Sequence, residues 1–300
     1  RRSSDLIDKL RERKIQVVLA TPSGGMPHWL TQKYPETLQV QADGTVNLPG
    51  KRHNFCYSSP VMRRKVKQID RALAQRFGKK ENVILWHISN EFGGNFKDST
   101  CHCEKCQKKF REWLKNKYGT LDKLNASWWT GFWSHKYTDW DQIHSPSPQG
   151  ECLTTALTLD WKRFSSEQIT DFCKMEADAL REFSDLPTTT NMMGFFKGVD
   201  YNTLKNAVDI ISWDNYPFWH ERKDEVPEAV YTSAGNALMR SLKREPFLLM
   251  ESTPSSVSWR SHNPLKRPGM HMLSSMQAVA HGADSVQYFQ WRSEEHTSEL

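Results

Sequence analysis

Leu-Trp-His-Ile-Ser-Asn-Glu-Phe-Gly-Gly, residues 85–94, is the stretch from which the fold is predicted. The hydrophobic run from Val83 to Ile88 contains several β-branched residues and predicts a buried strand that ends at the polar turn after it. Asn90 and Glu91 therefore lie at the strand end. In α/β barrels, catalytic side chains follow the carboxyl ends of parallel strands, whereas a carboxylate inside such a strand bears a large desolvation cost. Taken alone, the motif is equally typical of an ordinary polar turn.

A second stretch has the same construction. Phe247–Glu251 (Phe-Leu-Leu-Met-Glu) is an apolar strand that closes on a glutamate, and Ser-Thr-Pro-Ser follows it. Two acidic residues that close two apolar strands, far apart in the chain, make a carboxylate pair the leading hypothesis. Ordinary strand-end carboxylates are the alternative.

The rest of the chain alternates between strand and helix patterns. We expect strands at 15–20, 83–88, 187–191, 208–213, 247–251 and 285–289, and helices at 5–14, 60–77, 105–118, 158–183, 229–242 and 268–281. Residues 26–51 are rich in proline and glycine and predict an irregular loop. Strands that alternate with helices are typical of parallel βα units. A closed (β/α)8 TIM barrel needs eight strands, so we expect an α/β barrel with two strands missing.

The composition is that of a globular protein. Hydrophobic residues make up 37% and charged residues 25% of 300 residues, for which one domain is the default. No apolar run approaches the roughly 18 residues of a membrane span, so we expect no membrane partner. The net charge of +6 comes from lysines and arginines scattered along helices. This distribution favours solvated helix faces over a nucleic-acid-binding patch.

Three cysteines, Cys101, Cys103 and Cys106, lie within six residues. This tight spacing suits thiolates that converge on one soft cation better than separate disulfides, and zinc is the natural occupant. A tetrahedral site needs a fourth ligand. His102 lies awkwardly between two ligating neighbours, so Cys56 is the candidate. Four sulfurs would form a closed structural site in a reducing compartment, the cytoplasm, whereas free reduced thiols are the alternative.

Taken together, the two glutamates, the cysteine motif and the order of the strands resemble glycoside hydrolase family 42, the β-galactosidases. The matching stretches are 19–22 (LATP), 86–91 (WHISNE), 101–106, 121–133, 159–164 (LDWKRF), 189–191 (TTN), 213–217 (WDNYP), 250–254 (MESTP) and 287–291 (QYFQW). As an ordered set they are highly specific, although Asn-Glu alone is shared by a whole clan of glycosidases.

The resemblance implies roles for particular residues. It makes Glu91, after barrel strand four, the acid/base and Glu251, after strand seven, the nucleophile, while Asn90 bonds the sugar 2-hydroxyl. The family's remaining sugar-contacting positions align with Arg52, Tyr216, Trp259 and Phe289, and its structural zinc ligands align with Cys56, Cys101, Cys103 and Cys106. The implied activity is retaining hydrolysis that releases terminal β-D-galactose from β-galactosides.

The resemblance also implies how the chain is divided. Residues 1–292 correspond to a partial TIM-barrel catalytic domain with strands three to eight present, strands one and two missing, and a zinc-bearing insertion after strand four at about 93–150. We interpret residues 293–300 as a non-native tail that resembles a translated sequencing adapter. The full-length parent is then expected to be a homotrimer, and this piece alone is expected to be unstable and inactive.

Other functions stay open. An α-L-arabinopyranosidase would use the same scaffold, because the two sugars differ only by a hydroxymethyl group. A non-catalytic zinc protein that binds carbohydrate or nucleic acid is a further alternative, and the strands that end in glutamate favour the enzyme over it.

Overall fold

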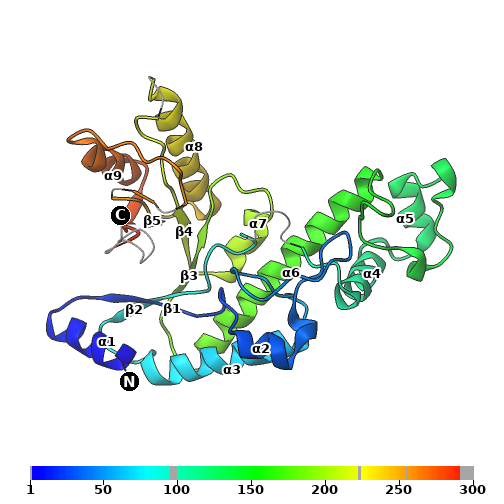
Figure 1. Ribbon diagram of the computed structural model, residues 1–300, viewed down its shortest axis with the longest axis horizontal. Helices are drawn as coiled ribbons and strands as arrows, with labels where there is room; N and C mark the ends of the chain where they lie inside the picture. Colours follow the sequence, from blue (N-terminus) through cyan, green and yellow to red (C-terminus); the bar gives the residue numbers. More distant parts are fainter. Residues whose placement is uncertain (1, 95–99, 222–223, 255, 258, 291–300) are drawn as a thin grey trace.

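The central feature of the protein is one sheet of six parallel strands (Figure 1). The computed structural model describes residues 2–94, 100–221, 224–254, 256–257 and 259–290. The strands are Val17–Ala20 (β1), Val83–His87 (β2), Thr188–Met192 (β3), Ile210–Asp214 (β4), Phe247–Glu251 (β5) and Ala283–Val286 (β6). They lie side by side in chain order, and all five neighbouring pairs are parallel. Their carboxyl ends therefore meet at one edge of a sheet that fits a half-barrel.

All six expected strands are present, with one clear shift of position. Strand β6 lies at Ala283–Val286 instead of the expected 285–289. Two further hydrogen bonds continue this pairing, from the Gln287 N–H to the Leu249 carbonyl (2.8 Å) and from the Phe289 N–H to the Ser252 carbonyl (2.8 Å). The apolar pattern of the sequence includes these residues, although the regular ladder ends before them. The predicted tail, 293–300, lies outside the described residues.

Helices cover the sheet and form the connections between strands. They are Arg2–Glu12 (α1), His28–Lys33 (α2), Pro60–Phe77 (α3), Glu104–Tyr118 (α4), Leu121–Trp128 (α5), Thr155–Arg181 (α6), Tyr201–Leu204 (α7), Val226–Lys243 (α8) and Met270–Ala280 (α9), with short 3-10 turns at Pro35–Thr37, Phe132–Ser134, Trp140–Gln142 and Lys205–Ala207. The expectation that 26–51 is wholly irregular is wrong, because α2 and the first 3-10 turn lie there. None of the described helices is long and apolar enough to cross a membrane.

The main hydrophobic core lies between the sheet and its helices. Trp86 of β2 and Trp213 of β4 are its largest buried side chains. The Trp86 indole N–H donates to Ser184 Oγ at 2.9 Å. Trp213 packs directly on Gly235 of α8, where an added Cβ would lie 2.4 Å from the indole. Gly235 is therefore required by close packing of the helix on the sheet.

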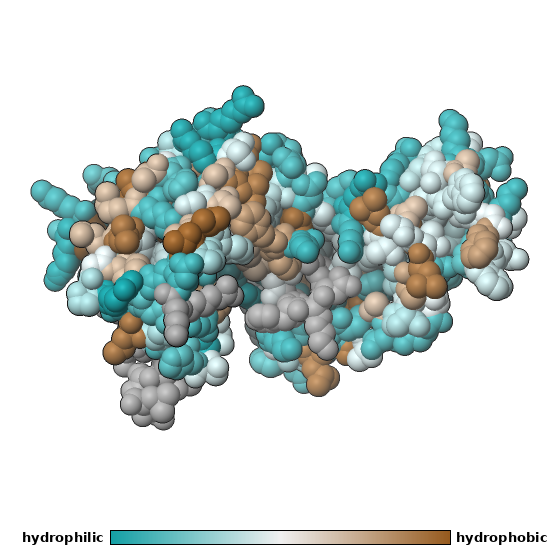
Figure 2. Space-filling view, turned by 90° about the horizontal axis from the view of Figure 1, so that it is seen from above, coloured by the Kyte–Doolittle hydropathy of each residue, from teal (hydrophilic) through white to brown (hydrophobic). Residues whose placement is uncertain are grey.

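A second core lies in the region between β2 and β3. It contains α4, α5 and the first half of α6, which form the arm that extends to the right in Figure 1 and the right-hand mass in Figure 2. Its buried members are mostly aromatic, aliphatic and sulfur-bearing side chains: Cys56, Cys101, Cys106, Phe110, Leu114, Leu124, Trp128, Ile143, Leu157, Trp161 and Phe164. The second half of α6, from Ile169 to Leu180, belongs to the main core. One helix thus passes through both cores.

Candidate active site

Three carboxyl groups converge at the carboxyl edge of the sheet. Glu251 is the last residue of β5, Asp214 is the last residue of β4, and Glu91 follows β2 after a short turn. One carboxylate oxygen from each of the three lies within 4.8 Å of the other two. The two glutamates expected from the sequence are therefore brought together, and Asp214 joins them.

Arg52 and Asn90 connect the two glutamates. Arg52 Nη2 lies 2.5 Å from Glu91 Oε2 in a mostly buried ion pair. When the Asn90 amide is oriented to satisfy both of its neighbours, its oxygen accepts from Arg52 Nη1 at 3.1 Å and its nitrogen donates to Glu251 Oε1 at 3.2 Å. The turn that holds Glu91 is tight, with φ of 57° at Ser89 and 45° at Glu91. Such left-handed values are uncommon for residues other than glycine, so surrounding contacts must hold this turn.

Asn191, on β3 between the two glutamate-bearing strands, is a hub that the sequence analysis did not assign. Its Oδ1 accepts from the Glu91 N–H (2.8 Å) and from His87 Nε2 (2.8 Å). Its Nδ2 donates to Asp214 Oδ2 (2.6 Å) and Glu251 Oε1 (3.2 Å). Burial lowers the pKa of His87, so its imidazole is neutral at neutral pH. The available signal was an amide residue near the end of a strand of β-branched threonines.

The electrostatics of the site favour retention of a proton. Burial, followed by the negative charges of Glu251 and Glu91, raises the pKa of Asp214 well above its usual range. Burial also raises the pKa of Glu251, and the charge of Glu91 adds to this effect, while the Tyr216 hydroxyl and Arg52 oppose it. One Asp214 oxygen lies within 4.8 Å of a Glu91 oxygen. The raised pKa values of Asp214 and Glu251 thus favour retention of a proton in the three-carboxyl group.

Aromatic rings form a wall beside Glu251. The Tyr216 hydroxyl donates to Glu251 Oε2 at 2.5 Å. The ring of Trp259 packs edge-on to that of Tyr216, with ring centroids 4.9 Å apart. The ring centroids of Phe289 and Trp259 lie 6.2 Å apart. Trp259 remains 54% exposed, so its face is open to solvent. Asp214, Tyr216 and Trp259 also line a cavity of about 570 Å³, which is large enough for a small ligand.

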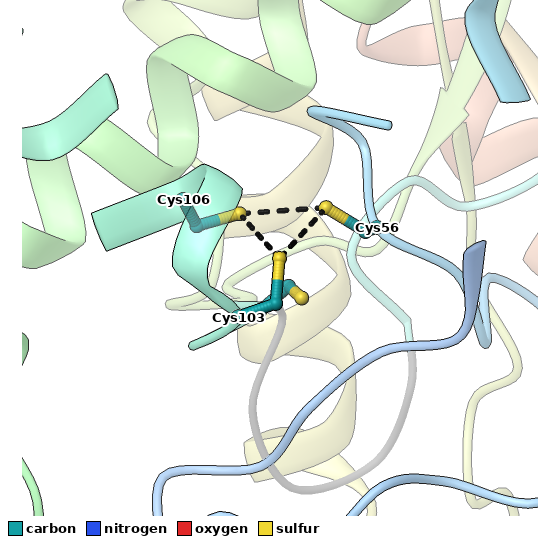
Figure 3. A group of neighbouring side chains, drawn as sticks. Cys56, Cys103 and Cys106 are labelled. Carbon is teal, nitrogen blue, oxygen red and sulfur yellow. Dashed lines mark hydrogen bonds between the residues drawn. The ribbon is translucent and has the colours of Figure 1, made fainter. Parts of the chain in front are cut away.

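The four expected zinc ligands meet in one cluster. Cys56 Sγ lies 3.6 Å from Cys103 Sγ and 3.4 Å from Cys106 Sγ, and the last two are 3.9 Å apart (Figure 3). Cys101 completes the group, with all four sulfurs within 4.8 Å of one another. A tetrahedral zinc site with Zn–S bonds of about 2.3 Å has sulfurs roughly 3.8 Å apart. The residues therefore fit zinc, and all six cysteines of the chain are free thiols.

A pair of carboxylates at the carboxyl edge of a parallel sheet, flanked by aromatic rings, is the kind of site found in glycoside hydrolases. The model of the family Glyco_hydro_42, described as beta-galactosidase, matches residues 4–300. The chain belongs to glycoside hydrolase family 42.

Individual relatives are similar over almost the whole chain. Beta-galactosidase BglY of Alicyclobacillus acidocaldarius is 54% identical over 289 residues, which cover 96% of this chain and 41% of that protein. The cold-adapted beta-galactosidase from Rahnella sp. R3 superposes with a TM-score of 0.94 at 52% identity, over 98% of this chain and 43% of that one. A catalytic mutant of Gan42B, a GH42 beta-galactosidase from G. stearothermophilus, gives a TM-score of 0.93 at 50% identity, over 97% and 43%. The chain thus spans less than half the length of these relatives.

Proposed function

We propose that this chain supplies the catalytic centre of a retaining β-galactosidase that releases terminal β-D-galactose. The observation that carries the proposal is the convergence of Glu91 and Glu251, with oxygens within 4.8 Å of each other. Retaining glycosidases place their two carboxyl groups about 5–5.5 Å apart, whereas inverting enzymes need about 6.5–9.5 Å to admit a water molecule.

In the proposed mechanism, Glu251 attacks the anomeric carbon while Glu91 protonates the departing oxygen. A covalent glycosyl-enzyme forms, and Glu91 then acts as the base that activates water to hydrolyse it. The Tyr216 hydroxyl and the Asn90 amide orient the Glu251 carboxylate through their hydrogen bonds. Arg52 fixes the carboxylate of Glu91. The raised pKa of Asp214 favours its neutral form, which lowers the negative charge beside Glu91.

The same proposal assigns the substrate contacts. Arg52 and Asn90 supply donors and Tyr216 an acceptor to the sugar hydroxyls, and Trp259 and Phe289 offer ring faces to the apolar face of a pyranose. The half-exposed Trp259 fits this role, because its face is not covered by the described protein. The substrate is accordingly a β-galactoside oligosaccharide, and nucleic acid is not a partner.

We propose that zinc holds Cys56, Cys101, Cys103 and Cys106 together as thiolates. With four sulfur ligands the ion has no open position, so its role is to stabilise the fold. This proposal agrees with the sulfur spacing and with the burial of the cluster in the second core. A zinc-thiolate site also suits the reducing conditions of the cytoplasm, where we place the protein.

Two further proposals concern the architecture. The six strands correspond to strands three to eight of a (β/α)8 barrel, and the arm at about 93–150 is the zinc-bearing insertion after strand four. The full-length protein is proposed to form a homotrimer, which size-exclusion chromatography with light scattering would test.

The deciding experiment is hydrolysis of p-nitrophenyl β-D-galactopyranoside by the full-length gene product, with Glu251→Ala as the control. We expect turnover in the parent, loss in the variant, and the β anomer as the first product in NMR spectra. An α first product would contradict the retaining mechanism, and a folded, zinc-loaded parent without turnover would favour a carbohydrate-binding barrel. The second candidate substrate is an α-L-arabinopyranoside, because its sugar has the same pyranose ring as galactose. Rates on p-nitrophenyl α-L-arabinopyranoside, compared with those on the galactoside, show which sugar the enzyme prefers.

A further inference from the structure

Two buried carboxyl groups of the main core lie outside the three-carboxyl site. Asp70 of α3 and Glu176 of α6 are both fully buried, with relative exposures of 0%. Glu176 Oε2 accepts from the Thr21 hydroxyl at 3.0 Å, and Oε1 accepts from the Ser23 hydroxyl at 2.8 Å. Both hydroxyls follow β1, at the same edge of the sheet as the active site. The mechanism proposed above uses neither carboxyl.

The Thr21 hydroxyl connects Glu176 with the turn that carries the acid/base. Thr21 Oγ1 accepts from the Ser89 N–H at 2.8 Å. The same hydroxyl donates its own proton to Glu176 Oε2. Ser89 has a φ of 57° and lies two residues before Glu91. Glu176 therefore holds, through one hydroxyl, the first residue of a turn that needs external support.

The Ser23 hydroxyl connects Glu176 with the segment that carries Arg52. The carbonyl of Gly24, the residue after Ser23, accepts from the His53 N–H at 2.9 Å. His53 Nε2 in turn lies 3.0 Å from Ser89 Oγ. Burial, followed by the charge of Arg52, lowers the pKa of His53 to about 3, so this imidazole is neutral. The two connections meet at the ion pair between Arg52 and Glu91.

Asp70 completes the support from behind. The two carboxyl groups lie close enough for each to shift the pKa of the other, and among the described residues no lysine, arginine or histidine contributes to either shift. Burial raises the pKa of Asp70 to about 9 and that of Glu176 to about 7, so the pair holds at least one proton at neutral pH. A shared proton gives the pair a hydrogen bond without a counter-ion. Glu176 is thereby held rigidly between α3 and the residues after β1.

We propose that Glu176, supported by Asp70, is a positioning residue for proton transfer, which sets the placement of Glu91 through Thr21 and of Arg52 through Ser23. This inference rests on the proposed role of Glu91 as acid/base. Misplacement of the acid slows glycosidic cleavage where the leaving group needs a proton, and has little effect where the leaving group departs as a stable anion. A residue that only stabilises the fold would change both kinds of substrate equally.

The test compares kcat/KM on lactose and on 2,4-dinitrophenyl β-D-galactopyranoside in the full-length gene product. Glu176→Gln keeps the size of the side chain but leaves only one carbonyl oxygen for two hydroxyl donors. We expect it to lower kcat/KM on lactose at least about tenfold more than on the aryl galactoside, because small misplacements near a reacting group can cost up to about 100-fold. The matched control is Asp160→Asn, an equally buried carboxyl on the same helix that lies in the second core. The control should leave the ratio unchanged.

Thr21 gives a second test that does not depend on tolerance of Glu176→Gln. Thr21→Ser keeps the hydroxyl and should retain the parent ratio, whereas Thr21→Val keeps the shape, removes the hydroxyl, and should reproduce the selective loss on lactose. Equal losses on both substrates for Glu176→Gln or Thr21→Val would overturn the proposal. If the parent hydrolysed neither galactoside, the proposed function itself would fail, and the two failures are therefore distinguishable.

Discussion

Helix α6 passes through two cores and places one buried carboxyl group in each. The pKa values of these two groups shift in opposite directions. In the second core, Asp160 forms an ion pair with the Lys117 ammonium and accepts a hydrogen bond from the Tyr118 hydroxyl. In spite of its burial, these bonds lower the pKa of Asp160. In the main core, Glu176 receives only hydroxyls and the neighbouring Asp70, and its pKa is raised. The same burial thus gives a fixed charge at one end of the helix and a shared proton at the other.

The difference teaches how each region uses its polar groups. The second core is held by rings, sulfurs and an ion pair that contact one another within the arm. The sheet region directs its buried polar groups toward the edge where Glu91 and Glu251 meet. We therefore expect changes in the second core to act on stability and changes at the sheet edge to act on catalysis.

The largest effect is expected for Glu251→Gln. Loss of the proposed nucleophile should lower kcat by about 10⁴-fold or more, while the free energy of unfolding stays equal or rises because a buried charge beside Glu91 is removed. Glu167→Gln, at the insertion end of α6, is the matched control and should keep parent activity. Steady-state rates and urea melts of the full-length gene product measure both. A large loss of stability in Glu251→Gln would contradict the expectation that changes at the sheet edge act on catalysis and not on stability.

The next effect concerns the sulfur cluster. Cys106→Ser, or removal of the proposed zinc ion by a chelator, should lower the stability of the second core by several kcal/mol, because metal binding to such a site is coupled to folding. Hydrogen exchange should accelerate in α4 and α5 and remain slow in β2–β5. Cys152→Ser is the control, since this thiol is exposed and outside the cluster. Uniform acceleration across the sheet would show that the two cores unfold as one.

The third prediction uses the sign of the pKa shifts. Asp70 and Glu176 have raised pKa values in the folded state, so between pH ~4 and their folded values of about 9 and about 7 the folded protein binds more protons than the unfolded one. Their contribution to stability therefore falls as pH rises, by up to about 1.4 kcal/mol per pH unit for each proton. Asp160, with a lowered pKa, acts in the opposite direction, and its contribution is lost as pH falls.

Urea midpoints at pH 3, pH 5 and pH 8.5 measure this contrast, because the Asp160 contribution is lost only below about pH 4 and the Asp70 contribution is lost above about pH 5. Asp70→Asn should flatten the loss of stability toward pH 8.5, and Asp160→Asn should flatten the loss toward low pH. The same pH dependence in parent and Asp70→Asn would contradict the shared-proton description of the main core.

The smallest effect compares one glycine from each region. Gly235→Ala should cost about 1–3 kcal/mol of stability, because the new Cβ overlaps the Trp213 indole in a closely packed core. Gly131→Ala, in the second region, adds a methyl group to open space at a φ of −67° and should change stability by less than about 1 kcal/mol. Thermal or urea melts measure both. An equal loss at the two positions would show that packing does not distinguish these sites.

Much of the fold could be predicted because strands and polar turns are local signals. The apolar runs before Glu91 and Glu251 defined both strands and the residues at their ends. Helix α2 was missed because the prolines and glycines around it dominate the pattern of 26–51. Strand β6 was placed too late because the aromatic residues Tyr288 and Phe289 fit a strand pattern, although the regular ladder ends at Val286.

The polar support of the site could not be predicted from the sequence. Asn191 acts through partners on three other strands, and no local pattern shows which face of β3 it occupies. Glu176 stands in a helix of mixed polarity, where an acid is ordinarily solvent-exposed. Its burial depends on the packing of α3 against α6, and this is tertiary information.

Helix α6 also has a mechanical consequence. Its 27 residues form a rod about 40 Å long, which joins the ring-packed arm at one end to the support of the Glu91 turn at the other. Because the helix is one continuous element, a rotation of the arm about the helix axis would also rotate the part of the helix that carries Glu176. Force applied to the arm, for example in an optical trap, would therefore act on the proton-transfer geometry at a distance.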